Sequence, residues 1–262
     1  MLINKKFKIL RISATILLVL FSINLTAQDD GDPEDNWEFV VAPYIFFTSL
    51  TGDAGVGVTG STEVSADFSD LLKVLEFGFM FHGEVQKGDW GGMIDITFAK
   101  VGDDLSVARN GIADVEAKLA IIEAFGNHRF VREWGHIDAF AGVRFWDIDL
   151  DMSLDLGGGL FTGDITRGDS YVDPVIGGRV LYNFSDTWFA MLRSDIGGFG
   201  VGSDFSFNVQ PSLGYRFTDT FSLVGQYRYL TTDFSSGTSG TTDYFLLDIN
   251  LHGPLVGFVF QF

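Results

Sequence analysis

The last eight residues of the chain alternate bulky apolar side chains with other residues and end on an aromatic. Val256, Phe258, Phe260 and Phe262 occupy alternate positions, and alternate positions share one face of a β-strand. Soluble proteins seldom end on a strand that exposes three phenylalanines on one face, whereas a barrel in a bilayer needs an apolar outer face on every strand. This ending therefore predicts the lipid-facing final strand of a membrane barrel.

The same alternation begins at Trp37 and recurs along the chain, which predicts an all-β fold. Apolar sets of period two lie near 37–47, 77–85, 90–98, 119–121, 137–145, 172–182, 190–196, 205–217, 221–229 and 244–262. Short connections, near 88–89, 130–135, 185–187 and 218–220, alternate with long ones, near 52–75, 102–115, 151–170, 199–204 and 233–243. Outer-membrane barrels have short periplasmic turns and longer outer loops. We therefore predict an antiparallel transmembrane β-barrel of ten strands, with eight or twelve as the alternatives.

One segment in the first outer loop breaks the alternation. Phe68, Leu71, Leu72 and Leu75 share one face of a helix. They predict a short amphipathic helix over 67–75, packed on or into the barrel mouth.

The N-terminal residues have the pattern of a secretory signal peptide. Four basic residues precede the mostly apolar run Ile12–Ile23, and small residues follow it. A retained membrane anchor is the alternative, although the run is short for a spanning helix. We predict a signal peptide at 1–27, a disordered acidic lead-in at 28–36 and the barrel at 37–262.

Charge and cysteine content exclude several function classes. Without residues 1–27 the chain keeps 13 basic and 35 acidic residues, a formal net charge of −22. Nucleic acid is therefore not an expected partner. The chain has no cysteine, so it has neither thiol nucleophiles nor thiolate metal sites. No cofactor is predicted.

Alternate residues of a strand face opposite sides, so when the apolar side chains face lipid, the polar side chains between them face the lumen. The predicted luminal network consists of Glu38, Asp138, Arg144, Asp173, Arg179, Arg193, Asp195, Arg216, Arg228, Asp248 and His252. An isolated charge in a low-dielectric interior costs several kcal/mol, so these groups should pair or contact water. A wide pore typically needs about 16 strands, so a largely filled lumen is expected.

One hairpin allows its register to be derived. Gly88-Asp89 is a two-residue turn with glycine first, and pairing Lys87 with Trp90 places His82 opposite Asp95. Glu84 lies on the same face. A carboxylate beside an imidazole fixes its tautomer, as a general base requires, so these three residues are the candidate catalytic group. The alternative is a polar pair that holds the barrel together, and the depth of the pair within the strand favours this alternative.

Asp147, Asp149 and Asp151 line one face of a strand where it leaves the membrane. Divalent cations could bridge these carboxylates to lipopolysaccharide. A solvated acidic strand is the simpler interpretation.

In the terminal segment the apolar residues shift from one face of the strand to the other. Its apolar residues occupy odd positions from Phe245 to Leu251 and even positions from Val256 onward. Since glycine and proline are typical of β-bulges, we predict a bulge at Gly253-Pro254 that keeps the apolar residues outward on both sides.

Several stretches together resemble a group of small outer-membrane β-barrel proteins of Gram-negative bacteria. They are Ala42-Pro43-Tyr44, Phe68-Ser69-Asp70-Leu71-Leu72, the segment from Asp173-Pro174 to Gly177-Gly178-Arg179, and His252-Gly253-Pro254 with the terminal Phe262. The resemblance implies no catalytic residues. It does imply that Phe258, Phe260 and Phe262 belong to the signal read by the barrel-assembly machinery.

Three functional hypotheses follow for a protein exported to the bacterial outer membrane. The first is a structural or interaction role with a filled polar lumen, in contact with outer-membrane lipid and lipopolysaccharide. The second is a narrow channel for solutes or ions, gated by the 67–75 helix. The third is an enzyme acting on lipid or peptide through His82, Asp95 and Glu84.

Overall fold

The computed structural model describes residues 36–57, 61–107, 111–155 and 162–262. The predicted signal peptide, and the lead-in except Asn36, lie outside the described residues. Within them the chain forms one helix, α2 (Phe68–Val74), and twelve strands. The strands are β1 (Trp37–Phe46), β2 (Ser49–Val56), β3 (Ser61–Ala66), β4 (Leu75–Lys87), β5 (Trp90–Val107), β6 (Gly111–Arg132), β7 (Gly135–Asp155), β8 (Thr162–Asn183), β9 (Trp188–Gly198), β10 (Phe205–Thr218), β11 (Phe221–Ser236) and β12 (Phe245–Gln261).

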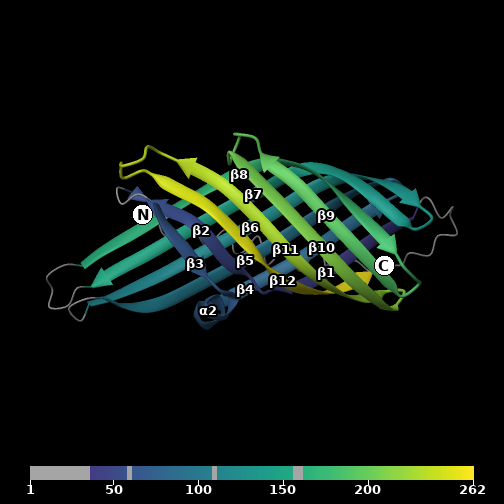
Figure 1. Ribbon diagram of the computed structural model, residues 1–262, viewed down its shortest axis with the longest axis horizontal. Coiled ribbons are helices and arrows are strands. Elements are labelled where there is room, and N and C mark those ends of the chain that lie inside the picture. The colour runs from purple at the N-terminus through teal and green to yellow at the C-terminus, as the bar shows by residue number, and fades with distance from the viewer. Residues whose placement is uncertain (1–35, 58–60, 108–110, 156–161) are drawn as a thin grey trace, which may run out of the picture. The chain divides into compact units, whose positions relative to one another are not determined.

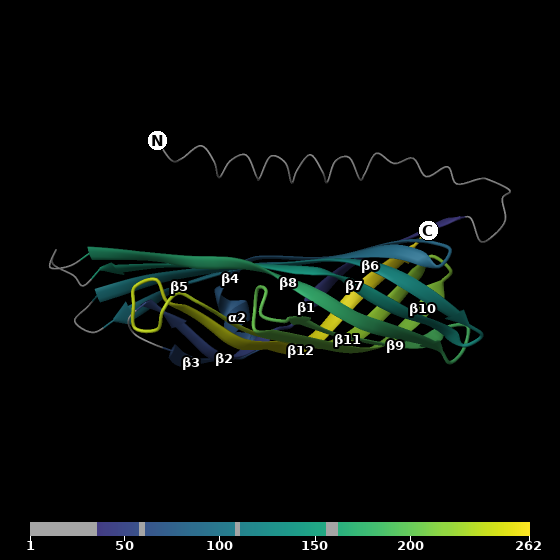
Figure 2. The same ribbon diagram turned by 90° about the horizontal axis from the view of Figure 1, so that it is seen from above.

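Ten strands close into an antiparallel barrel, which confirms the predicted fold class (Figure 1). β1 and β4–β12 pair in order around the barrel, and β1 closes it by pairing with β12. β2 continues the line of β1 and pairs with the first half of β12, while β3 pairs with β2 (Figure 2). The start of β1 and the C-terminus lie at the end of the barrel that carries the short turns. In membrane barrels of this kind that end faces the periplasm.

Several strands are much longer than a bilayer requires. β6, β7 and β8 contain 22, 21 and 22 residues, whereas about 9–11 residues of a tilted strand cross a membrane. The segments expected as outer loops near 102–115 and 151–170 are therefore mostly paired strands, and the segment near 52–75 contains the end of β2, β3 and α2. We call the paired strands beyond the bilayer the outer extension. Polar and glycine-rich segments can pair there because water, not lipid, contacts their outer face.

The outer face of the barrel carries a band of exposed aromatic and aliphatic side chains. Trp90, Ile176, Leu213 and Phe258 are all well exposed, as are Phe260 and Phe262 of the terminal strand. Aromatic contacts lie beside the short turns, for example between Trp188 and Tyr215 with ring centroids 5.0 Å apart. Such a band is stable in lipid and would be costly in water.

β12 corrects the prediction of a bulge. Its pairing with β11 continues in one register from Phe260 to Phe245, and the apolar residues from Phe245 to Leu251 are buried inside the barrel. Asp248 and His252, expected in the lumen, consequently face outward: Asp248 is exposed and His252 is partly exposed. The parity change marks the place where the strand leaves the membrane, because beyond it the polar face meets water and the apolar face packs inward.

The helix α2 has the predicted position but does not enter the lumen. None of its residues is buried, and it contacts β5 of the barrel and β2 beside it. Phe68 packs against Phe47 with ring centroids 4.9 Å apart, while Leu72 stays exposed. In the described part of the chain no helix is long and apolar enough to cross a membrane.

Candidate functional site

Three layers follow one another along the lumen, from the periplasmic end into the outer extension. Nearest the short turns lies an open chamber, above it a layer of ion pairs, and above that an apolar plug. Each layer draws side chains from strands far apart around the barrel, such as β6 and β11 in the ion-pair layer, so each crosses the lumen.

The apolar plug is the largest cluster of buried apolar side chains in the described residues. It consists of Ile121, Trp146, Tyr171, Leu230, Phe234, Phe245, Leu247, Ile249 and Leu251. Tyr171 on β8 stacks on Phe234 of β11 at 3.9 Å between ring centroids, although these strands are not neighbours in the sheet. Trp146 is completely buried. A solute crossing this layer would have to displace close-packed side chains.

The ion-pair layer is organised around Glu123, which is completely buried. Its carboxylate accepts hydrogen bonds from Arg144 Nε at 2.6 Å and from an Arg193 Nη at 3.0 Å, and an Arg228 Nη lies 3.4 Å away. Asp195 accepts from Arg144 at 2.6 Å on its other side. Four strands thus contribute charges to one network. Because the network is desolvated, each charge depends on its partners.

Sequence reasoning missed Glu123. The adjacent Ile121 and Ile122 make the alternation along β6 ambiguous, and the apolar pattern alone predicts Ile121 on the outward face. In the structure Ile122 faces lipid and Ile121 belongs to the plug. The missing signal was the register with β5, which places Glu123 beside the inward-facing Asp95.

Most of the predicted luminal network is in the lumen. Asp138, Arg144, Asp173, Arg179, Arg193, Asp195 and Arg228 are all buried, at 5% exposure or less. Asp173 makes no ion pair among the described residues; it accepts hydrogen bonds from the backbone N–H and hydroxyl of Ser203, at 2.7 and 2.8 Å, and so holds the β9–β10 loop. Glu38 and Arg216 lie in the wall of the chamber.

The chamber is a cavity of about 180 Å³. Its wall includes Glu38, Arg216, Ser222 and Gln261, which are the inward-facing residues nearest the short turns and the termini. It therefore opens toward the periplasmic end of the barrel. Arg193 and Arg228 of the ion-pair layer form part of its wall at the other end.

The His82 group lies in the chamber wall with the predicted register. His82 pairs with Asp95 across β4 and β5, and Gly88 has the positive φ of 55° that the turn requires. His82 Nε2 lies 2.8 Å from Glu84 Oε1, and Nδ1 lies 3.2 Å from Asp95 Oδ2. Both ring nitrogens are thus engaged by carboxylates. Neither remains available to take a proton from a substrate.

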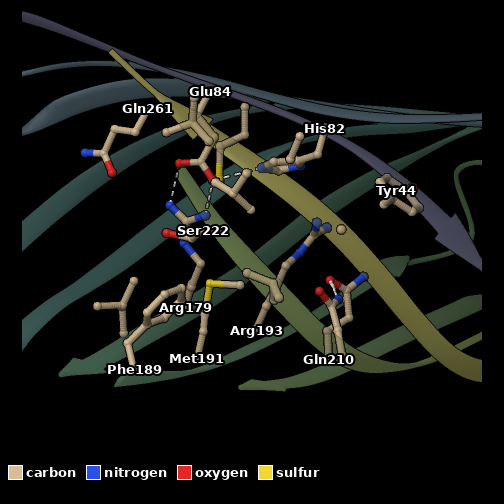
Figure 3. A pocket seen from close by; sticks show the side chains of 18 of the residues that line it. Tyr44, His82, Glu84, Arg179, Phe189, Met191, Arg193, Gln210, Ser222 and Gln261 are labelled. Carbon is tan, nitrogen blue, oxygen red and sulfur yellow. Dashed lines mark hydrogen bonds and ion pairs between the residues drawn. The ribbon is translucent and has the colours of Figure 1, made fainter. Parts of the chain in front are cut away.

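The two carboxylates around His82 are themselves held by other groups, and Figure 3 shows Glu84 between His82 and Arg179. Glu84 forms a bidentate pair with Arg179, and one of its distances is 2.8 Å. Arg179 also donates to the buried Asp138 at 2.6 Å. Asp95 accepts a hydrogen bond of 2.7 Å from Tyr44. Such a continuous network rigidifies the wall.

The candidate cation site on β7 faces the outside of the outer extension. Asp147 is exposed and Asp149 partly exposed; the side chain of Asp151 lies outside the described residues. Burial, followed by the negative charge of Asp149, raises the pKa of Asp147. Within the described part of the chain, no three His, Asp or Glu side chains are grouped as a metal site would require.

A second acidic row crosses the outer face of the extension and was not predicted. Asp248 lies directly opposite Asp53 on β2 and Asp233 on β11, and Asp53 lies opposite Glu63. Partial burial, with the charges of Asp248 and Asp204, raises the pKa of Asp233. Like charges directly opposite across strands are destabilising, so this row opposes folding at neutral pH.

Comparison with solved structures supports the fold. The outer membrane protease OmpT from Escherichia coli is 10% identical, with 90% of this chain and 99% of that chain covered and a TM-score of 0.51. The translocator domain of the autotransporter NalP from Neisseria meningitidis is 12% identical, over 95% and 98% of the two chains, with a TM-score of 0.49. The attachment invasion locus protein Ail of Yersinia pestis, in complex with the heparin analogue sucrose octasulfate, is 11% identical over 87% and 99%, with a TM-score of 0.39.

At 10% identity the similarity to OmpT shows a shared fold and no more. No protein-family model and no curated protein matches the chain. The chain therefore has the fold of outer-membrane β-barrels, and its activity has to be argued from its own lumen.

Proposed function

We propose that the protein is an integral outer-membrane barrel with a structural or interaction role, closed to the passage of solutes. The observation that supports this proposal is the filling of the lumen. Two successive layers lie above the chamber: one of paired buried charges and, beyond it, one of apolar side chains that reaches into the outer extension. A conducting pore would need a continuous hydrated path, which neither layer leaves.

Single-channel recording tests this proposal. The mature chain, refolded into planar bilayers, should give no discrete conductance steps across salt concentrations, while heat-modifiable gel mobility verifies that it is folded. A variant with a damaged plug, Trp146→Ala, should give intermittent steps, because it removes the largest fully buried side chain. Phe145→Ala, the lipid-side neighbour, is the matched control. Steps from the unmodified protein would favour the channel hypothesis, and neutralising Arg193 or Asp195 should then change ion selectivity.

The enzyme hypothesis is the weaker rival. His82 has both nitrogens bonded to carboxylates, which suits a role in holding the wall together. We expect His82→Ala to lower barrel stability. A folded His82→Ala variant that loses a lipase or peptidase activity present in the unmodified protein would instead support catalysis by His82, Asp95 and Glu84.

The proposal also includes the route to the membrane and the partners there. Export would depend on the signal peptide at 1–27, and assembly on the outward-facing Phe258, Phe260 and Phe262. Deleting Phe262 should lower the fraction of protein that becomes heat-modifiable in the outer membrane of a Gram-negative host. Lipopolysaccharide is the proposed neighbour of the outer extension, with divalent cations offsetting its carboxylates.

A further inference from the structure

We infer that the periplasm-facing chamber binds a small apolar carboxylate, with Arg216 as its anion contact. This inference concerns a ligand site and goes beyond the closed-barrel role. It rests on an arginine without a carboxylate partner among the described residues, on the apolar side chains that line the chamber beside it, and on the size of the cavity.

Arg216 differs from the other arginines of the chamber wall. Arg129, Arg179, Arg193 and Arg228 each have a carboxylate oxygen within 4 Å. In the described residues Arg216 has none: it donates to the amide oxygen of Asn183 at 2.7 Å and lies 4.5 Å from the centroid of the Phe189 ring. A guanidinium at the mouth of a cavity, with donors left over, is suited to a bidentate carboxylate.

The wall on both sides of Arg216 is apolar. On β8 and β9 it is formed by Leu181, Phe189 and Met191, and on β11 and β12 by Val224, Leu255 and Val259. Leu181 pairs with Met191 in register, and Val224 lies across Gly214 of β10, two residues from Arg216. Leu181, Met191, Val224 and Val259 belong to none of the apolar clusters formed by the described residues. Their apolar surface is thus directed at the chamber.

The opposite wall is charged but internally satisfied. Glu84 bonds to both His82 and Arg179 (Figure 3). His82 also bonds to Asp95, and Arg179 to Asp138. The chamber is therefore amphipathic, and the uncompensated charge beside its apolar side is the positive charge of Arg216. Arg228 Nε, which is buried without a partner, supplies a further donor in the chamber wall.

The volume limits the ligand to a small molecule. An engineered apolar cavity of roughly 150 Å³ accommodates benzene, so about 180 Å³ suits an aromatic or short aliphatic group. Its carboxylate would extend toward Arg216 at the mouth. A free small acid and the C-terminal residue of a peptide share this chemistry.

The test uses the full mature chain in nanodiscs and 3-phenylpropionate as the probe. Binding is followed by saturation-transfer NMR, with protein-free nanodiscs as the blank. The neutral amide of the same acid should bind with an affinity lower by about tenfold or more, because it lacks the charge-assisted contact. Arg216→Gln should remove the preference for the acid, and Arg216→Lys should retain part of it. Met191→Trp, which fills the cavity, should abolish binding of both compounds.

Arg132→Gln is the matched control, since Arg132 is an exposed turn arginine outside the chamber that donates to its neighbour's carbonyl. It should leave both affinities unchanged. A peptide ending in phenylalanine that binds more tightly than 3-phenylpropionate would identify a peptide terminus as the source, and weaker binding would identify a free acid. Equal binding of acid and amide, an equal loss in Arg132→Gln, or no saturable binding at all would overturn the inference.

Discussion

Glu123→Gln should destabilise the barrel strongly, because Glu123 is the shared partner of three buried arginines. At an effective dielectric constant of about 20, an ion pair at 4 Å is attractive by roughly 4 kcal/mol, and the closest two contacts of Glu123 are shorter, at 2.6 and 3.0 Å. Desolvation of each ion offsets several kcal/mol of this attraction. Removing one partner from a buried pair typically costs about 3–5 kcal/mol, because the remaining charge stays buried and uncompensated.

We therefore expect Glu123→Gln to lose about 3 kcal/mol of unfolding free energy. Glutamine keeps the shape and an acceptor, so the loss reports the charge. The assay is reversible urea unfolding in phospholipid vesicles, followed by tryptophan fluorescence. Glu38→Gln is the matched control, since Glu38 is exposed at the mouth and lies 3.8 Å from Arg129; it should change stability by less than about 1 kcal/mol. A loss below about 1 kcal/mol for Glu123→Gln would mean that water screens the layer, and would refute the description of a dry, filled lumen.

Two further substitutions test the outer extension and the junction of β1 with β2. Asp233→Asn should stabilise the protein by a few tenths to about 1 kcal/mol at pH 7. The raised pKa of Asp233 means that its ionised form is disfavoured in the folded protein. The gain in stability should therefore shrink as the pH falls through that pKa and vanish below the usual value of 3.8, which urea midpoints measured as a function of pH would reveal. A gain that persists at pH 3 would contradict the electrostatic cause. Gly253→Ala should cost about 1–3 kcal/mol, because Gly253 has φ 154° and an added Cβ would lie 2.1 Å from the Phe47 carbonyl oxygen. Gly257→Ala, where the nearest atom would be 3.4 Å away, is the control, and equal losses in the two variants would exclude this explanation.

The fold was predictable because a bilayer imposes one simple rule on every strand that crosses it. Outward apolar residues at alternate positions identified the ten barrel strands, and the Gly88-Asp89 turn gave the pairing of His82 with Asp95. The network around Glu123 was not predictable in the same way. Its partners come from β7, β9 and β11, which meet only after the barrel closes. Local alternation carries no information on contacts across a lumen.

The errors in β12 have one physical cause. The rule that apolar side chains face outward holds only within the bilayer, whereas the prediction for β12 applied it to the whole strand. Beyond the membrane the rule reverses, so Ile249 and Leu251 enter the plug while Asp248 and His252 face water. β7 has the same reversal. Val143 is exposed in the apolar band, and the charged Asp147 lies four residues further along the same face of the strand. A change of apolar parity thus locates the membrane boundary along a strand.

This boundary can be mapped directly, because the chain has no cysteine and single cysteines can be labelled without background. Val256→Cys and Asn250→Cys both lie on the outward face of β12, on the two sides of the proposed boundary. An environment-sensitive fluorophore should report lipid at 256, with quenching by nitroxide-labelled phospholipid, and water at 250. Ile249→Cys should resist labelling in the folded protein, because Ile249 is 3% exposed within the plug. A bulge at Gly253-Pro254 would give the opposite result, with lipid quenching at 249 and protection at 250, and would move Asp248 back into the lumen.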